Sequence, residues 1–381
     1  MRSLLLAALT ALVKPEPITL PFTRGRVALT LDGQILHFWV DSGSARSFAF
    51  YGPVYEEVFG KDSCGRSPYG CYFCPPENPC DDILSRKVWT VALGSDDLYK
   101  YVKHSVTLGI GNYTLENFSF GLVVKHPSRH RTSAALLGLS LGRPTIPETF
   151  LKQLKRRRVI NTLSYSIHTS EQGPAITGKL TLDDSETAEA PYILFTRDLM
   201  FGHAKVALPA GPLVLLDSLG RQLNARRRGD EMQPALVDSG ASSVYVSERD
   251  FDKIIDVTWS AMCRENARAS IKKKKQLQEE DGLLRMVRKE ALPYLPTLGY
   301  KIGDPPNTID IRIEPKHYVH SCDAVWCRMN IRPRNLRTTS FGHPFFRAYN
   351  VKFDLDNKRL SFISNSEGNS TPAAVVESTH L

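Results

Sequence analysis

The sequence has no apolar run beyond its first residues that is long enough to cross a membrane. A spanning helix needs about 20 apolar residues, and the run from Leu4 to Val13 has only about ten. A cationic start, this short run and a Pro-rich exit are typical of a secretory signal peptide, which we place at residues 1–16. No small-x-small cleavage site marks its end, and a short anchoring helix is the alternative. We expect no stable membrane insertion after signal cleavage.

Cysteine is sparse, with 7 residues in 381, which excludes a small disulfide-dominated protein. The 10 histidines show no metal-ligand spacing, so no metal or other cofactor is expected. An apolar content of 42% excludes disorder and collagen, and it allows two or more packed cores. The net charge of +9 permits anionic partners without requiring them. Because no aromatics interleave the lysines at 272–275, we expect a solvated helix there and no nucleic acid partner.

The cysteines and the glycosylation motifs fit export from the cell. Four cysteines crowd into one loop-like stretch, where two disulfides are expected in an oxidising route and a four-thiolate zinc site is the alternative. One of the three later cysteines must stay unpaired or bond another chain. The early set is Cys64, Cys71, Cys74 and Cys80, the late set is Cys263, Cys322 and Cys327, and the N-glycosylation motifs lie at Asn112, Asn117 and Asn369.

Short β-branched or aromatic runs dominate the chain and predict a mainly β protein. Three helices are expected: one that starts at Thr145 and ends in the cations at 155–158, one that starts at Ser247, and a charged one over 267–290. The expected strands are Arg26 to Leu31, Ile35 to Val40, Lys87 to Leu93, Val102 to Ile110, Phe118 to Val124, Tyr165 to Ile167, and Lys179 to Leu182.

An internal repeat gives the strongest signal. Val40-Asp41-Ser42-Gly43-Ser44 recurs half a chain later as Val237-Asp238-Ser239-Gly240-Ala241. Each copy follows apolar residues, and each is followed much later by a strand-like pair and a glycine, at Leu136-Leu137-Gly138 and Ser340-Phe341-Gly342. The repeat therefore predicts two homologous lobes, each with one aspartate at the end of a buried strand.

Paired aspartates suggest a specific chemistry. If the lobes pack around a pseudo-twofold axis, Asp41 and Asp238 meet, and two close carboxyl groups share one proton over an acidic-to-neutral range. The ionised member can draw a proton from a water held between them while the protonated member polarises a substrate carbonyl. Gly43 and Gly240 would let backbone amides approach the carboxylates, and the hydroxyls of Ser42 and Ser239 would tie the loops together, with Ser44 beside them.

With these features the chain resembles the pepsin-like aspartic peptidases over roughly Phe22 to Ser364. The resemblance implies a two-lobed acid protease fold with a pseudo-twofold axis, a central cleft for an extended peptide and a hairpin flap. It also implies that Cys263 pairs with Cys322 or Cys327. Besides the triplets, the matching segments are Leu136 to Leu139, Phe150 to Leu154, Gly178 to Leu180, Ile313 to Tyr318 and the closing run Phe341 to Leu360.

The sequence departs from the family pattern at three places. Leu93, before Gly94, stands where the family usually has the flap tyrosine, which removes a hydroxyl from the flap and substrate-binding region. Ala241 stands where a Thr or Ser usually bonds the second aspartate, so that side of the dyad is expected to be less acidic. His343 replaces the usual aspartate of the closing Gly-Asp-Pro.

The sequence thus predicts a secreted or endolysosomal aspartic endopeptidase that acts as a monomer on a peptide or protein substrate. Its expected parts are residues 17–190 as the first lobe, 191–365 as the second and 366–381 as a polar tail. The main alternative is a weak or inactive pepsin-like protein that binds peptides or proteins in the same cleft. A lesser alternative is a serine hydrolase, because Gly138-Leu-Ser140-Leu-Gly142 fits a nucleophile elbow.

Overall fold

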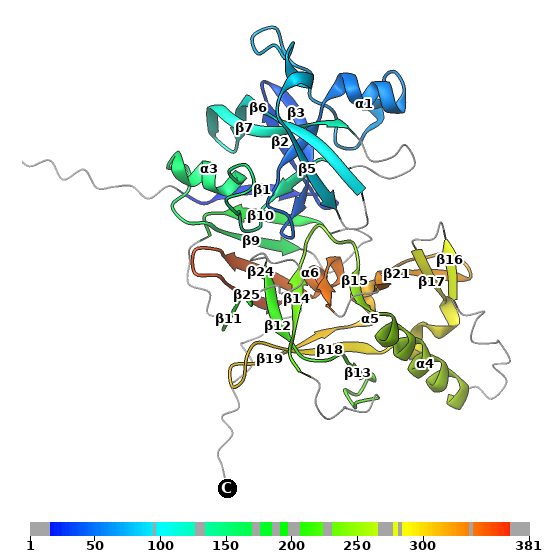
Figure 1. Ribbon diagram of the computed structural model, residues 1–381. Coiled ribbons are helices and arrows are strands. Elements are labelled where there is room, and N and C mark those ends of the chain that lie inside the picture. The colour runs from blue at the N-terminus through cyan, green and yellow to red at the C-terminus, as the bar shows by residue number, and fades with distance from the viewer. Residues whose placement is uncertain are drawn as a thin grey trace, which may run out of the picture.

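The computed structural model describes residues 16–93, 97–125, 134–169, 176–184, 191–196, 206–223, 231–265, 277–280, 284–334 and 338–365. Strands dominate these residues, as predicted, and they form four sheets (Figure 1). Their sequences alternate as amphipathic strands do; in β1, for example, buried and exposed side chains alternate at every position.

The first half of the chain builds a seven-stranded sheet. Short helices α1 (Gly52–Phe59), α2 (Ser63–Arg66), η1 (Ile83–Ser85) and α3 (Phe150–Arg156) accompany it. In spatial order its strands are β2 (Arg26–Leu31), β3 (Gln34–Asp41), β8 (Leu136–Gly138), β4 (Phe48–Phe50), β7 (Tyr113–Lys125), β6 (Asp97–Ile110) and β5 (Val88–Leu93).

The second half builds a larger sheet and a smaller one beside it. The larger sheet runs β13 (Val214–Leu216), β18 (Thr297–Ile302), β12 (Ala207–Ala210), β14 (Gln233–Val237), β23 (Ser340–Phe341), β15 (Val244–Ser247) and β22 (Ile331–Arg334), with β19 (Ile309–Ile313) paired to β18. The four-stranded sheet runs β16 (Leu277–Glu280), β17 (Leu284–Arg288), β21 (Trp326–Met329) and β20 (Val319–Cys322).

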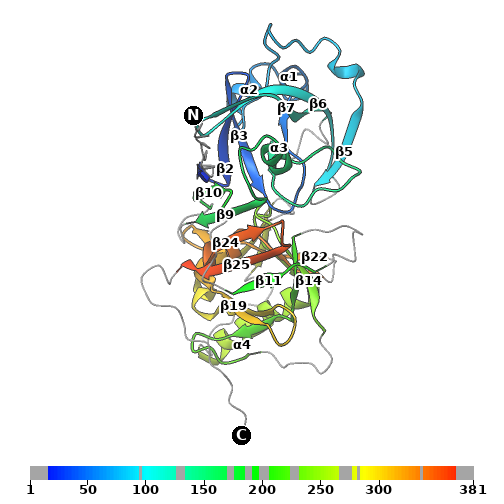
Figure 2. The same ribbon diagram turned by 90° about the vertical axis from the view of Figure 1, so that its left-hand side faces the viewer.

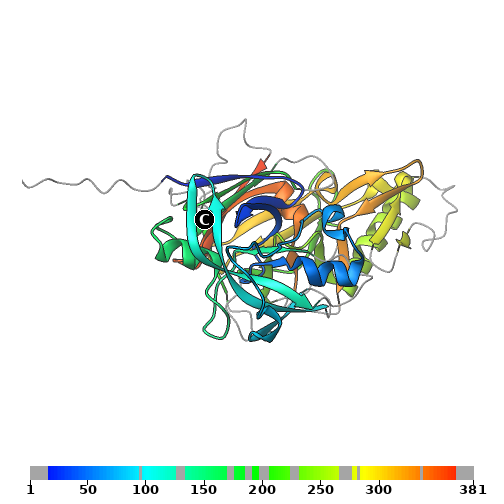
Figure 3. The same ribbon diagram turned by 90° about the horizontal axis from the view of Figure 1, so that it is seen from above.

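The helices of this half are α4 (Glu248–Glu265), η3 (Lys289–Tyr294), α5 (Pro315–Tyr318) and α6 (His343–Ala348). Helix α4 and the four-stranded sheet lie at one side of the molecule in the view from above (Figure 3).

A six-stranded sheet joins the two halves, and Figure 2 shows it between them. Strands from the two halves pair directly where β9 meets β24. The lobe boundary predicted between residues 190 and 191 falls next to positions outside the described residues, so it stays a prediction. The order is β1 (Ile18–Phe22), β10 (Gly178–Leu182), β9 (Ser164–Thr169), β24 (Tyr349–Asp354), β25 (Arg359–Ser364) and β11 (Tyr192–Leu194).

All seven strands expected from the sequence are present, but the helices needed correction. The first helix begins after Thr149, whose side chain caps it by accepting a hydrogen bond from Lys152 N, and not at Thr145. The second starts after Ser247 as predicted, with Ser247 Oγ accepting from Asp250 N.

The third predicted helix, over 267–290, was wrong for every residue described there before η3. Positions 277–280 and 284–288 form the hairpin β16–β17, which pairs with β21. Pairing with β21 places Met286 and Val287 in buried positions, and this tertiary packing outweighs the helix propensity of the charged residues. Positions 267–276 lie outside the described residues.

Two disulfides hold the early cysteine loop, Cys64–Cys71 and Cys74–Cys80, which confirms disulfides over a four-thiolate zinc site. The pairing of Cys263 with a later cysteine was wrong, because Cys322 and Cys327 bond each other and Cys263 is a free, half-buried thiol. Cys322 and Cys327 face each other across the β20–β21 pair with Cα atoms 4.0 Å apart, so they meet as soon as that hairpin forms.

Among the described residues no helix is long and apolar enough to cross a membrane. Asn112 and Asn117 are both exposed, so the predicted glycosylation there is sterically possible and stays a prediction. The signal peptide, except its last residue, the polar tail and Asn369 lie outside the described residues.

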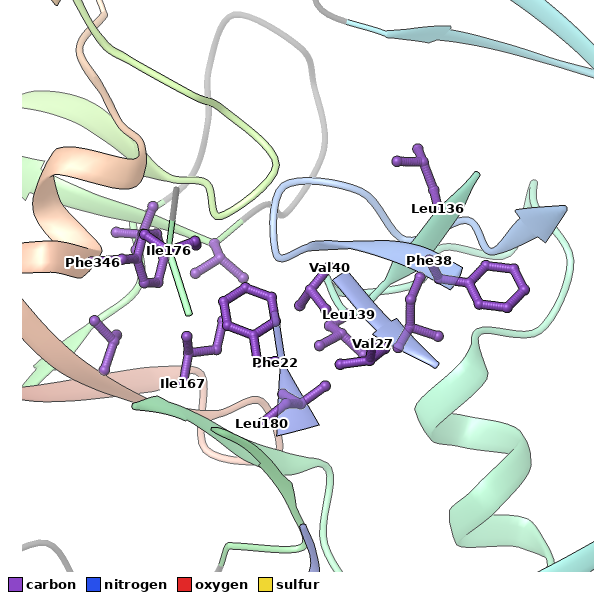
Figure 4. Close-up of a cluster of buried hydrophobic side chains, with 14 of the residues drawn as sticks. Phe22, Val27, Phe38, Val40, Leu136, Leu139, Ile167, Ile176, Leu180 and Phe346 are labelled. Atoms are coloured by element: carbon purple, nitrogen blue, oxygen red, sulfur yellow. The ribbon is translucent and has the colours of Figure 1, made fainter. Parts of the chain in front are cut away.

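The hydrophobic core is continuous from the first sheet into the shared sheet. Figure 4 draws Phe22 among Ile167, Leu180 and Val40, so residues of the shared sheet pack near the strand that ends at Asp41. This continuity makes the position of that strand depend on the shared sheet.

We predict that Phe22→Ala lowers the free energy of unfolding by roughly 3–5 kcal/mol, because Phe22 is fully buried and the lost ring leaves a cavity. Urea denaturation followed by circular dichroism measures the change. Leu219→Ala is the control: Leu219 is 75% exposed, so its loss should change stability by less than about 0.5 kcal/mol. Equal, small effects of both substitutions would contradict the assigned core.

Candidate functional site

The two Asp-Ser-Gly loops occupy equivalent places in the two halves. Strand β3 runs into Asp41 and pairs in parallel with β8, and β14 ends just before Asp238 and pairs in parallel with β23. In the first half β8 lies antiparallel to β4, and β4 pairs in parallel with β7. In the second half β23 lies antiparallel to β15, and β15 pairs in parallel with β22. The duplicated sequence has therefore folded into a duplicated topology.

The downstream glycines of the repeat pack against the segments that follow each loop. A Cβ on Gly138 would lie 2.5 Å from the carbonyl oxygen of Arg46, and a Cβ on Gly342 would lie 2.4 Å from that of Ala241. Only glycine fits such a close approach of two backbones. This contact explains why the sequence repeats a glycine at the end of a short strand, β8 or β23, in both halves.

The two loops are tied to each other by reciprocal hydrogen bonds between their serines. Ser42 Oγ donates to Val237 O at 2.8 Å and accepts from Ser239 N at 2.9 Å. Ser239 Oγ donates to Val40 O at 2.9 Å and accepts from Ser42 N at 3.0 Å. Both serines are completely buried, so all four bonds are shielded from water.

This arrangement brings the two aspartate side chains together. Besides burial, the charge of Asp238 acts directly on Asp41 and raises its pKa. Each carboxyl group also lies over the glycine of the opposite loop: a Cβ on Gly43 would lie 2.6 Å from Asp238 Cγ, and a Cβ on Gly240 would lie 2.6 Å from Asp41 Cγ. Any side chain at either glycine would push the carboxyl groups away.

Backbone amides hold each carboxyl group within its own loop. Asp41 Oδ1 accepts hydrogen bonds from Gly43 N at 2.8 Å and Ser44 N at 2.9 Å. Asp238 Oδ1 accepts from Gly240 N at 2.9 Å. The structure thus places Asp41, Ser42, Gly43 and Ser44 in one loop and Asp238, Ser239 and Gly240 in the facing loop.

Burial and the facing carboxylate control protonation at this site. Burial, and then the charge of Asp238, raises the pKa of Asp41 well above its ordinary value of 3.8, against the opposing effect of the amides of Gly43 and Ser44. A proton is therefore retained by the pair at pH values where an exposed aspartate is ionised. Such a pair offers one acid and one base side by side.

Tyr165, on β9 of the shared sheet, lies near enough to the two aspartates for their charges to act on its phenol. Its side chain is fully buried and stacks on Phe353 with ring centroids 4.5 Å apart. Burial first, and then the charges of Asp41 and Asp238, raise the pKa of Tyr165 well above 10.0, so its phenol stays neutral. The shared sheet therefore contributes a buried, neutral phenol near the two aspartates.

Two residues that sequence reasoning did not place at the site contact the Asp238 loop. Trp39 Nε1 donates to Gly240 O at 3.1 Å, and His343 Nε2 lies 3.2 Å from Ser239 O. The two rings stack with centroids 5.4 Å apart. A tryptophan two residues before the first aspartate, and a histidine in place of an expected aspartate, were the available signals.

The flap region is only partly described. Leu93 ends β5 and is half-buried against the hydrophobic core, while Gly94 lies outside the described residues. Ala241 brings no side-chain hydroxyl to Asp238, and its backbone N–H donates to Asp238 O at 3.2 Å.

The nucleophile-elbow alternative does not fit the fold. Ser140 is 4% exposed, and its backbone N–H donates to Ser44 O at 2.9 Å beside the first loop. The next helix begins only at Phe150, so the strand–turn–helix arrangement of an elbow is missing around Ser140.

One group in the described part of the chain has metal-ligand geometry: the ligand atoms of Cys74, Cys80 and His104 lie within 4.8 Å of one another. The two sulfur atoms are joined in a disulfide, which removes the thiolates that a metal would need. His104 instead takes part in a hydrogen-bond chain in which Arg86 contacts Nδ1 and Tyr72 contacts Nε2.

Comparison with known proteins decides the family. The family model described as eukaryotic aspartyl protease matches residues 85–365. The chain belongs to the eukaryotic aspartyl protease family. This match contains Asp238 but begins after Asp41, so the assignment of the first loop of this family member comes from the repeat and from the geometry above. No curated protein matches the chain.

We predict that Asp41→Asn stabilises this aspartyl protease increasingly as pH rises above 3.8, the ordinary pKa of aspartate. With a raised pKa the folded state keeps a proton that the unfolded chain loses, so the wild type loses stability as pH rises through that window, whereas Asn carries no charge. Urea denaturation at a series of pH values gives the difference between the two proteins.

The surface residue Asp310 provides the control. Its side chain is 72% exposed, so Asp310→Asn should show a difference from wild type that hardly changes with pH. A pH-independent difference for Asp41→Asn as well would show that the two carboxyl groups do not interact.

Proposed function

We propose that the protein is an aspartic endopeptidase in which Asp41 and Asp238 activate a water molecule to hydrolyse a peptide bond. The observation that carries this proposal is the mutual placement of the two carboxyl groups, each over the glycine of the opposite loop. Membership of the eukaryotic aspartyl protease family supports a peptide or protein as the substrate.

In the proposed mechanism the ionised member of the pair takes a proton from the water as its oxygen attacks the scissile carbonyl carbon. The protonated member donates a hydrogen bond to the carbonyl oxygen, which becomes a hydroxyl of the tetrahedral intermediate. As the C–N bond then breaks, one hydroxyl of the intermediate returns its proton to the pair, the amine leaves with the proton that the pair took from the water, and a carboxylic acid remains. The dyad ends with one proton, as it began.

The raised pKa of Asp41 supports this division of roles, because it keeps one carboxyl group protonated while the other is ionised. The four serine hydrogen bonds support it by fixing the separation of the loops before substrate arrives. A rigid site of this kind avoids reorganisation during the reaction.

We place the protein in a secreted or endolysosomal compartment. Three disulfides fit an oxidising route of synthesis, and Asn112 and Asn117 are exposed for glycosylation. A monomer is sufficient for the proposed chemistry, since one chain supplies both aspartates.

Digestion of a denatured protein in the acid-to-neutral range tests the proposal. We expect Asp41→Asn and Asp238→Asn each to lower kcat by roughly 10²–10⁴-fold, because each removes a general acid or base. Asp310→Asn should retain wild-type activity. Equal activity of all variants would rule out the dyad, and a folded wild type that cleaves nothing but binds peptides would establish the alternative binding function.

A further inference from the structure

We propose that Trp39 and His343 act together as a clamp that positions the Asp238 loop, taking over the support that a hydroxyl at residue 241 would give. The kinetic effects expected of this clamp rest on the proposed function. The way the clamp holds the carboxyl group of Asp238 does not depend on that function.

The clamp holds the loop through three backbone carbonyl groups in succession. His343 Nε2 contacts Ser239 O at 3.2 Å, Trp39 Nε1 donates to Gly240 O at 3.1 Å, and the backbone N–H of His343 donates to Ala241 O at 2.9 Å. Because a carbonyl oxygen only accepts, the imidazole must carry its proton on Nε2. Every peptide carbonyl of the Ser239–Ala241 turn thus has a donor from outside the loop.

One of these bonds leads directly to the aspartate. The carbonyl of Ser239 and the N–H of Gly240 belong to the same peptide group, and that N–H donates to Asp238 Oδ1 at 2.9 Å. A donor on the carbonyl side polarises the peptide and strengthens the bond on the N–H side. His343 therefore supports the ionised form of Asp238 without touching it.

Trp39 adds a connection between the two halves of the molecule. It lies on β3, two residues before Asp41, yet its indole N–H reaches the loop that carries Asp238. Its ring stacks on His343 with an interplanar angle of 20° and so fixes the orientation of the imidazole. A displacement of the Asp238 loop would break the indole hydrogen bond, and a displacement of β3 would break the stack as well.

The surroundings of His343 keep its ring neutral. The side chain is 2% exposed, and burial, followed by the charge of Arg347, lowers its pKa to about 3. Arg347 and His320 are the charged or titratable groups whose fields act on it. The ring is therefore neutral above about pH 3, and its Nε2–H donates to Ser239 O in either protonation state.

Paired variants separate positioning from bulk packing. Trp39→Phe keeps an aromatic ring but removes the indole N–H. Trp326→Phe is its control, because Trp326 is half-buried on β21 in the four-stranded sheet. His343→Leu removes the donor at similar volume, whereas His343→Gln retains an amide N–H at comparable reach. Circular dichroism and thermal unfolding establish that each variant is folded.

We expect Trp39→Phe and His343→Leu to lower kcat by about tenfold with little change in KM, the size of effect typical of residues that orient a reactive group. The acid limb of the pH profile of kcat should move to higher pH, because the ionised dyad loses support. Trp326→Phe and His343→Gln should stay close to wild type in both respects.

Carboxyl ¹³C NMR of aspartate-labelled protein provides a readout that does not need catalysis. The signals of Asp41 and Asp238 are assigned from the Asp41→Asn and Asp238→Asn proteins, and their titration should move to higher pH in Trp39→Phe and His343→Leu. If the wild type cleaves no peptide, the proposed function fails and this titration alone decides about the clamp.

Folded Trp39→Phe protein with wild-type kcat and wild-type carboxyl titration would overturn the clamp while leaving the proposed function standing. If His343→Leu does not fold, the Trp39→Phe result decides. An equal loss of activity in Trp39→Phe and Trp326→Phe would also overturn the clamp, because it would show that losing any indole lowers activity.

Discussion

The structure depends above all on the reciprocal hydrogen bonds between Ser42 and Ser239, because these bonds bring together the two aspartate loops, one from each half of the chain. Each serine donates to the strand of the other half and accepts from its loop, so neither loop can shift alone. In a buried, water-free position such bonds are costly to leave unmade. The close approach of the two aspartates follows from these four hydrogen bonds and from Gly43 and Gly240, which leave room for the carboxyl groups.

The same four hydrogen bonds place two acidic groups where their charges repel. Burial and mutual repulsion raise the pKa of Asp41, which means that the folded protein gives up stability at neutral pH in exchange for a pair that carries one proton. Other contacts must hold the loops against that repulsion. The shared six-stranded sheet, the core around Phe22 and the contacts of Trp39 and His343 supply this support from different directions.

Much of this arrangement could be predicted from the sequence, because a repeat carries its own evidence. Two copies of Asp-Ser-Gly, each behind a buried strand and each followed by a distant glycine, predicted two equivalent loops. The strands were predictable from their short β-branched or aromatic runs. The N-terminal cap of α3 was misplaced from Thr149 to Thr145, since both threonines precede the same apolar residues and only tertiary packing distinguishes them.

Contacts between distant segments could not be predicted in this way. The hairpin β16–β17 forms because β21 offers it a partner, which local helix propensity does not register. The bond between Cys322 and Cys327 depends on the register of β20 and β21, and expectation from family resemblance pointed to Cys263 instead. The roles of Trp39 and His343 appear only once their rings meet beside the second loop.

The most direct measurement is an atomic-resolution crystal structure of the protein with a statine-type peptide, whose hydroxyl takes the place of the attacking water. We predict that this hydroxyl lies within hydrogen-bonding distance of both Asp41 and Asp238, with the peptide extended between the two halves. Carboxyl groups too far apart for one oxygen atom to bridge, or directed into different cavities, would contradict it.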